Sequence, residues 1–337
     1  MKHAGWPHSR VNPIPLESFK PVSNMQRLGP GARIDYEKYQ WTSHLFDVEG
    51  SMVREITGRV SACGLWTVVV VAFHQWVGDV SITTTTHTLV GAALSLLLVF
   101  RTNSSYDRYW EGRKQWGSIL NESRNLGRAT RAFVAEGAPD LAEAIALWTA
   151  AFAHATKNSL RGTPDAGLGS AENRLPADAL RETLEEPHTP TGVAARISEK
   201  LAEARQRGVI SDYLLTYLDQ NVQLLIDYLG ACERIKKTPL PFVYVIFLRR
   251  ALIIYCFSLP FALVTFYGWL TIPVTLVAAF TFFGIEEIGV EIENPFGYDS
   301  NDLPLEEFCQ TIERDVFGVL GMPSSSTPET PAKAGRR

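Results

Sequence analysis

Two long uncharged stretches run straight into a charged, aromatic block, and this feature constrains the chain most. Residues 60–78 and 80–100 carry no formal charge. They are followed at once by residues 101–117, which read RTNSSYDRYWEGRKQWG. A helix of about 20 uncharged, mostly apolar residues is long enough to cross a bilayer. The sequence therefore predicts an integral membrane protein whose second membrane helix delivers a basic, aromatic segment to the membrane surface.

A second apolar region lies near the other end of the chain. Residues 251–285 carry no charge, and this run is too long for one straight span. Pro260, Gly268 and Pro273 interrupt it, which favours two helices joined by a turn near Gly268. We therefore predict four membrane helices, at about residues 60–78, 80–100, 242–265 and 272–288.

The remaining segments differ in composition from these helices. Residues 1–35 are polar and proline-rich, which is typical of a flexible arm, and residues 320–337 have the composition of a disordered tail. Between them we expect one membrane domain over residues 36–319. Its hydrophilic insert, residues 101–238, shows helical spacing of apolar residues in 115–133, 140–160 and 211–235. Residues 162–192, rich in Gly and Pro, are expected to form a loop-rich connector.

The distribution of basic residues predicts the topology. The turns at residues 79–86 and around Gly268 contain no Lys or Arg, whereas the opposite flanks contain Arg54, Arg59, Arg101 and Arg249. The positive-inside rule then places both termini and the insert in the cytoplasm, in a plasma or inner membrane. The first 40 residues contain no apolar leader, so we expect no signal peptide. A net charge of -4 argues against a nucleic-acid partner.

The sequence contains no motif that would indicate an enzyme, a cofactor site or a zinc site. Glu286, Glu287, Glu291 and Glu293 follow the last apolar run. They are either a solvated helix end or charges that line or support a pore.

One face of the second membrane helix has a regular apolar pattern. Ala92, Leu96 and Phe100 are spaced i, i+4 and i+8, so they lie on the same side of a helix. Such a stripe most often faces lipid or another helix. Several copies around an axis would instead form apolar rings that pass or block ions by wetting and dewetting.

Three ordered motifs resemble one family of ion channels. Residues 101–117, residues 230–242 (GACERIKKTPLPF) and residues 294–305 (NPFGYDSNDLPL) are similar to segments of the bacterial and fungal branch of the bestrophin family. The resemblance extends over about residues 39–319. It implies a homopentamer with four membrane helices per subunit, a helical cytoplasmic region and one axial pore, which has an apolar neck and a cytoplasmic aperture.

The resemblance also implies roles for individual residues. The neck positions correspond to Ala92, Leu96 and Phe100. The aperture residue follows a Ser-Asp pair and corresponds to Tyr213. The aromatic residues expected behind the neck are Phe280, Phe282 and Phe283. Their positively polarised ring edges would favour a dehydrated anion.

This chain departs from the family pattern at two places. Ala92 is smaller than the isoleucine typical of the bacterial branch, so its ring would be wider than those of Leu96 and Phe100. Animal members bind calcium through an acidic run after the NPFG motif. Here only Asp299 and Asp302 remain in the corresponding stretch. Calcium prefers six to eight oxygen ligands, so we expect turn chemistry, or at most weak calcium binding, at these residues.

We therefore expect a pentameric channel for monovalent anions, with chloride favoured. Its partners would be further copies of itself, monovalent ions and membrane lipid. Two alternatives stay open: a monovalent cation channel of the bacterial bestrophin type, and a membrane-anchored regulatory or scaffold protein. Ion flux through liposomes separates the channel from the scaffold, and reversal potentials in unequal salt separate anions from cations.

Overall fold

The computed structural model describes residues 52–164 and 166–323. The arm expected at residues 1–35 lies outside this range, as does most of the tail expected at 320–337. The regular structure of the described residues is all helical, with no strand among them, as the sequence predicts. Nine α-helices are described: α2 (Val53–Trp76), α3 (Thr84–Phe133), α4 (Pro139–Arg161), α5 (Ala177–Glu185), α6 (Thr189–Gln206), α7 (Asp212–Lys237), α8 (Phe242–Tyr267), α9 (Thr271–Glu291) and α10 (Leu305–Leu320).

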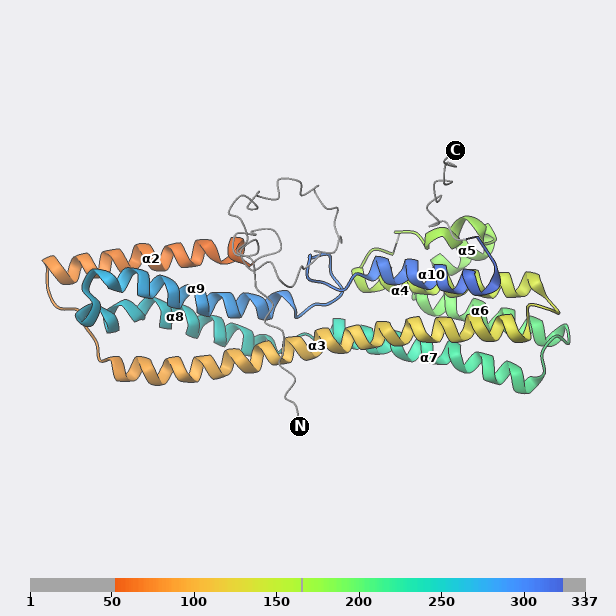
Figure 1. Cartoon of the computed structure of the whole chain (residues 1–337), viewed down its shortest axis with the longest axis horizontal. Helices are drawn as coiled ribbons and strands as arrows, with labels where there is room; N and C mark the ends of the chain where they lie inside the picture. The colour runs from red at the N-terminus through yellow and green to blue at the C-terminus, as the bar shows by residue number, and fades with distance from the viewer. Residues whose placement is uncertain (1–51, 165, 324–337) are drawn as a thin grey trace, which may run out of the picture.

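One helix, α3, joins the two parts of an elongated molecule (Figure 1). Its first half packs with α8 and α9, which α2 covers from the other side, and its second half packs with α4, α7 and α10. With 50 residues it is about 75 Å long at 1.5 Å per residue. We expected the hydrophilic insert to begin at Arg101. This residue lies inside α3, about a third of the way along, and its charge does not interrupt the helix.

The first part has the helices that suit a membrane. Three stretches are long and apolar enough to cross one: Val53–Trp76, Thr84–Phe133 and Phe242–Glu291. The third contains α8 and α9, separated by the short 3₁₀ turn Gly268–Leu270. Gly268 has a φ of +48°, a conformation that L side chains rarely adopt. Of the three expected interruptions only Gly268 turns the chain, because Pro260 lies within α8 and Pro273 in the first turn of α9.

The helix ends also differ from those expected from the charge-free runs. Helix α2 begins at Val53 and includes Arg54, Glu55 and Arg59. Helix α3 begins at Thr84 rather than near residue 80. There the Asp79 carboxylate accepts the Ser81 N–H at 2.8 Å, and the Ile82 N–H donates to the Phe261 carbonyl at 3.0 Å. These bonds hold residues 77–83 as a turn.

The second part is built like a soluble domain. Its core contains the fully buried Trp116, Trp148, Phe152 and Phe317. Helix α4 ends at Gly162, whose φ of +69° suits a C-terminal glycine cap. Residues 162–192, expected to be loop-rich, instead contain the 3₁₀ turn Gly169–Arg174, α5 and the start of α6. No expectation covered α10, which packs on α3 and α4 and completes this core.

Arg108 fixes the joint between the two parts. Its side chain donates to the carbonyls of Ile235 (2.6 Å), Glu293 (3.1 Å) and Thr238. Two of these carbonyls lie at the C-terminal end of α7, where unpaired carbonyls attract a cation. One side chain of α3 therefore holds both the end of α7 and the segment that follows α9.

We expect Gly112→Val to destabilise this joint and Gly117→Val to leave it nearly unchanged. A Cβ at Gly112 would lie 3.1 Å from the Phe296 ring and from Pro295, whereas a Cβ at Gly117 would lie 3.4 Å from only the flexible Arg113 tip. Both variants change helix propensity equally, so their difference reports packing. Overpacking typically costs about 1–3 kcal/mol. Thermal melting in detergent, followed by tryptophan fluorescence, measures the difference; equal melting temperatures would contradict it.

Candidate functional site: the α3 stripe and the arginine cluster behind it

The apolar stripe of α3 is uncovered in the protomer. Leu96 is 55% exposed and Phe100 56% exposed, and Ala92 is exposed on the same face. Leu94 and Leu98, on the other side of α3, are buried against α8 and α9. Because α3 is one continuous helix here, the spacing i, i+4 and i+8 does place the three side chains on one face. This face is available to further copies of the chain or to lipid.

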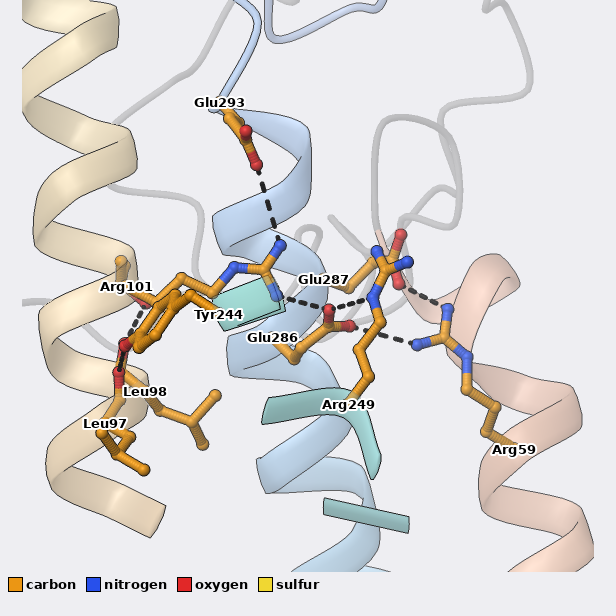
Figure 2. A network of polar contacts seen from close by, with 10 residues as sticks. Arg59, Leu97, Leu98, Arg101, Tyr244, Arg249, Glu286, Glu287 and Glu293 are labelled. Carbon is orange, nitrogen blue, oxygen red and sulfur yellow. Dashed lines mark hydrogen bonds and ion pairs between the residues drawn. The ribbon is translucent and has the colours of Figure 1, made fainter. Parts of the chain in front are cut away.

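Two tyrosines support α3 from behind the stripe. The Tyr244 hydroxyl donates to the Leu97 carbonyl at 2.8 Å (Figure 2). Tyr255 packs where Gly91 has no side chain, because a Cβ there would lie 2.6 Å from the tyrosine oxygen.

The three aromatic residues expected behind the neck are placed differently from one another. Phe282 meets the Tyr255 ring edge-on at 5.2 Å, Phe283 is buried in the helix core, and Phe280 is 48% exposed.

A buried carboxylate lies directly behind the end of the stripe (Figure 2). Arg101, which follows Phe100, is 1% exposed, and its Nη1 donates to Glu286 Oε1 at 2.5 Å. The same oxygen accepts Arg249 Nε at 2.8 Å, and Glu286 Oε2 accepts Arg59 Nη1 at 3.3 Å. Glu286 is itself 1% exposed. One carboxylate on α9 therefore binds arginines from α2, α3 and α8.

Two neighbouring carboxylates complete this arginine cluster, which we define as Arg59, Arg101, Arg249, Glu286, Glu287 and Glu293. Glu287 accepts from Arg59 Nη2, and Glu293 Oε2 lies 3.8 Å from Arg101 Nη2. The cluster contains three cations and three anions, so it is neutral as a whole. A buried charge needs such pairing, because a lone one would be strongly disfavoured away from water.

The interpretation of Glu286 as part of a solvated helix end is wrong, because its side chain is buried among three arginines. Glu286 lies on α9, so it is not part of the exposed face of α3 either. The sequence contained a signal for the correct arrangement. Arg59, Arg101 and Glu286 border the charge-free runs at residues 60–78, 80–100 and 251–285, respectively. Arg249 lies two residues before the start of the third run. The predicted topology puts all four boundaries on the same side of the membrane. Charges of opposite sign at the same depth can pair with one another, a pairing that we did not predict from the sequence.

Tyr213 lies far from the stripe, at the other end of the molecule. It is 80% exposed in the first turn of α7, which Ser211 caps by accepting the Leu214 N–H at 3.3 Å. One turn further, the Tyr217 ring meets Phe133 of α3 edge-on at 6.3 Å. The start of α7 therefore lies beside the end of α3. From Phe100 to Phe133 the helix rises about 50 Å at 1.5 Å per residue.

Asp299 and Asp302 form a turn that does not fit a calcium site. Asp302 Oδ2 accepts the Asp299 N–H at 2.8 Å, and the Asp302 N–H donates to the Asp299 carbonyl at 3.0 Å. Burial, with the negative charges of Asp299 and Glu291, raises the pKa of Asp302 to about 6. Within residues 52–164 and 166–323 no three His, Cys, Asp or Glu side chains are grouped to hold a metal. Calcium prefers several ionised carboxylates, and this turn offers two, one of them already bonded.

Comparison with known proteins identifies the family. A family model described as Bacterial/Fungal Bestrophin protein matches residues 33–317. A voltage-dependent anion channel-forming protein of Synechocystis is 40% identical over 287 residues, which are 84% of this chain and 92% of that protein. The chain belongs to the bestrophin family.

Two further comparisons support this family assignment. The voltage-dependent anion channel-forming protein YneE of Escherichia coli is 31% identical over 295 residues, covering 87% of this chain and 94% of YneE. The crystal structure of a bacterial bestrophin homologue from Klebsiella pneumoniae matches with a TM-score of 0.74 and 30% identity, covering 80% of this chain and 99% of that one. The resemblance seen in the three sequence motifs is thereby confirmed, and the chain is an integral membrane protein.

We expect Glu286→Gln to destabilise this bestrophin far more than Glu287→Gln. Removing the Glu286 charge leaves Arg101 buried without its closest partner, and breaking a buried pair typically costs about 3–5 kcal/mol. Among the described residues Glu287 pairs with Arg59 alone, and this pair is partly open to solvent (Arg59 40% exposed, Glu287 12% exposed), so its loss should cost less than that of Glu286. The two variants make the same chemical change at adjacent residues. Size-exclusion chromatography after stepwise heating measures the fraction of each variant that remains folded. Equal fractions for the two variants at every temperature would contradict the expectation.

Proposed function

We propose that the protein is a homopentameric channel that conducts monovalent anions, chloride first, through one axial pore. Ala92, Leu96 and Phe100 would line the neck, and Tyr213 the cytoplasmic aperture. The observation that carries this proposal is the uncovered apolar stripe of α3 in a chain of the bestrophin family. Two relatives at 40% and 31% identity are named anion channel-forming proteins, which supports the sign of the ion.

The burial pattern supports a ring of several copies. Only about a fifth of the most apolar windows of α3 and of the α8–α9 stretch are buried in the protomer (22% each). Lipid can cover part of the exposed surface. Beside its exposed apolar face, α3 also carries Thr86, Thr88 and Ser95, which are exposed in the protomer and suit contact with protein better than contact with lipid. Five copies with α3 innermost would turn this face toward a common axis.

We also propose four spans per subunit: α2, the first half of α3, α8 and α9. The turns at residues 77–83 and at Gly268 would face outward, because they contain no Lys or Arg. The arginine cluster and the α4–α7 region would face the cytoplasm, with both termini, by the positive-inside rule. This arrangement fits a bacterial inner membrane or a plasma membrane.

The neck would control conduction by wetting. Rings of Leu96 and Phe100 have no polar atom in their side chains, so water leaves a narrow constriction of this kind and ions are blocked. Ala92 would leave a wider outer ring. The neck has no charge of its own and does not choose the sign of the ion.

Purified protein in liposomes tests the proposal. We expect a mass of five protomers in detergent and flux of chloride down its gradient, with a reversal potential near the chloride equilibrium potential in unequal KCl. A reversal potential near that of potassium would support the cation channel instead. An intact protein that carries no ions under any voltage would support the scaffold alternative, and a conducting monomer or dimer would contradict the axial pore.

The double variant Leu96→Ala with Phe100→Ala is expected to conduct several times more than the wild type. Smaller side chains widen the ring and let water fill it, so the dewetting barrier falls. The matched control is Leu65→Ala with Phe266→Ala, because both of those side chains are 71% exposed and neither lies on α3. Single-channel recording at equal protein density measures the change. If both double variants behave alike, the constriction lies elsewhere.

Tyr213→Ala is expected to change the relative permeability of large and small anions and to leave stability unchanged. The side chain is 80% exposed, so its removal creates no cavity. Tyr213→Phe separates two contributions, because it keeps the ring that narrows the opening and removes the hydroxyl donor. Bi-ionic reversal potentials with chloride, bromide, iodide and thiocyanate measure the ratios. Ratios that stay fixed in Tyr213→Ala would remove Tyr213 from the aperture.

A further inference from the structure

The exposed stripe of α3 continues past the neck without a break. At 100° per residue, nine further side chains of α3 point within about 40° of the direction of Leu96. Ser118 is half-buried, and the other eight are exposed in the protomer: Asn103, Asp107, Trp110, Lys114, Asn121, Asn125, Arg128 and Ala132. The helix has no interruption between Thr84 and Phe133. If Leu96 and Phe100 face the pore axis, these side chains face it too.

The far end of this polar stripe reaches the proposed aperture. Arg128 Nη2 lies 3.4 Å from the Tyr217 hydroxyl, at hydrogen-bond distance. Tyr217 is one helical turn from Tyr213. The stripe therefore connects the two narrow points of the proposed pore and would line the cytoplasmic vestibule between them.

Two charges in this stripe have no bonding partner. Asp107 and Lys114 make no hydrogen bond or ion pair with any residue in the described part of the chain. The neighbouring arginines are used differently. Arg108 binds three backbone carbonyls, and Arg113 covers the Phe308 ring at 4.8 Å. Structural contacts therefore explain Arg108 and Arg113, and they leave Asp107 and Lys114 free to act on ions.

We propose that Lys114 is an anion-selecting residue, which acts through a ring of five ammonium groups in the cytoplasmic vestibule. Asp107 would form an opposing ring of carboxylates about 10 Å nearer the neck, at 1.5 Å per residue. The inference rests on the proposed function, since it needs the pentameric pore. The apolar neck sets no preference for charge, so the balance of these two rings decides how strongly anions are favoured over cations.

The physical reason is local concentration of ions. Clefts lined by one sign of charge and bounded by protein focus the field and raise the concentration of the opposite ion. The field of each ring reaches about 8 Å at 0.15 M salt, the Debye length. The two rings are separated by more than this distance, so each acts on its own section of the pathway. Lys114 favours anions in its section, and Asp107 disfavours them nearer the neck.

Reversal potentials of Lys114→Gln, Lys114→Glu and Asp107→Asn in unequal KCl test the proposal. We expect the chloride-to-potassium permeability ratio to fall several-fold in Lys114→Gln, further in Lys114→Glu, and to rise in Asp107→Asn. The control is Arg181→Glu on α5, which makes the same change of charge at a side chain that is 72% exposed and off the stripe. It should leave the ratio at the wild-type value.

A second measurement separates an electrostatic role from a structural one. At 1 M salt the Debye length falls to about 3 Å, so the difference between Lys114→Glu and the wild type should shrink. A difference produced by altered folding would persist, and pentamer mass in detergent checks assembly directly. Unchanged ratios in Lys114→Glu and Asp107→Asn, with a conducting wild type, would overturn the inference and leave the proposed function intact. A wild type that carries no ions would overturn both.

Discussion

The ion pair between Arg101 and Glu286 is the interaction on which the membrane part of this protein depends. In lipid, apolar helices gain little from meeting one another, since lipid tails are as apolar as leucine. Apolar packing alone would let α3 slide or rotate against α9. A buried charge allows one arrangement, because any shift separates it from its partner. Buried ion pairs are weak evidence for stability, but they can specify register. Here the register of α2, α3, α8 and α9 is specified at one depth, by one carboxylate.

The two parts of the molecule are held by different forces. The part formed by α4–α7, α10 and the second half of α3 buries Trp116, Trp148 and Phe317 in a core of the kind found in soluble domains, where the hydrophobic effect drives packing. The membrane part has a small core, and most of its apolar side chains remain uncovered. It therefore depends on lipid, on further subunits and on specific polar bonds, such as the one from Tyr244 to the Leu97 carbonyl. Helix α3 belongs to both parts and transfers the order of one to the other.

The sequence predicted the all-helical fold, the membrane segments and the family, because charge-free runs and three dense motifs are strong local signals. It could not predict that α3 passes Arg101 unbroken. A charge ends an apolar run, but the run alone does not tell where the helix ends, because arginine is itself a good helix former. The partner that allows Arg101 to be buried, Glu286, lies 185 residues away. The same distance hid the burial of Glu286. Helix α10 was missed because its role is visible only when α3 and α4 are in place. The neck and aperture residues remain predictions, since they depend on contacts between subunits.

The continuity of α3 has a mechanical consequence. A helix without a hinge acts as a lever, and Arg101 lies where such a lever would pivot, between the membrane helices and the hydrophilic domain. A tilt of about five degrees at this pivot would move the end near Phe133 by about 4 Å over the roughly 50 Å between them. A rearrangement in the hydrophilic domain would, in reverse, reach the neighbourhood of Phe100 as a small rotation. Distant ends of this subunit are therefore constrained to move as one body.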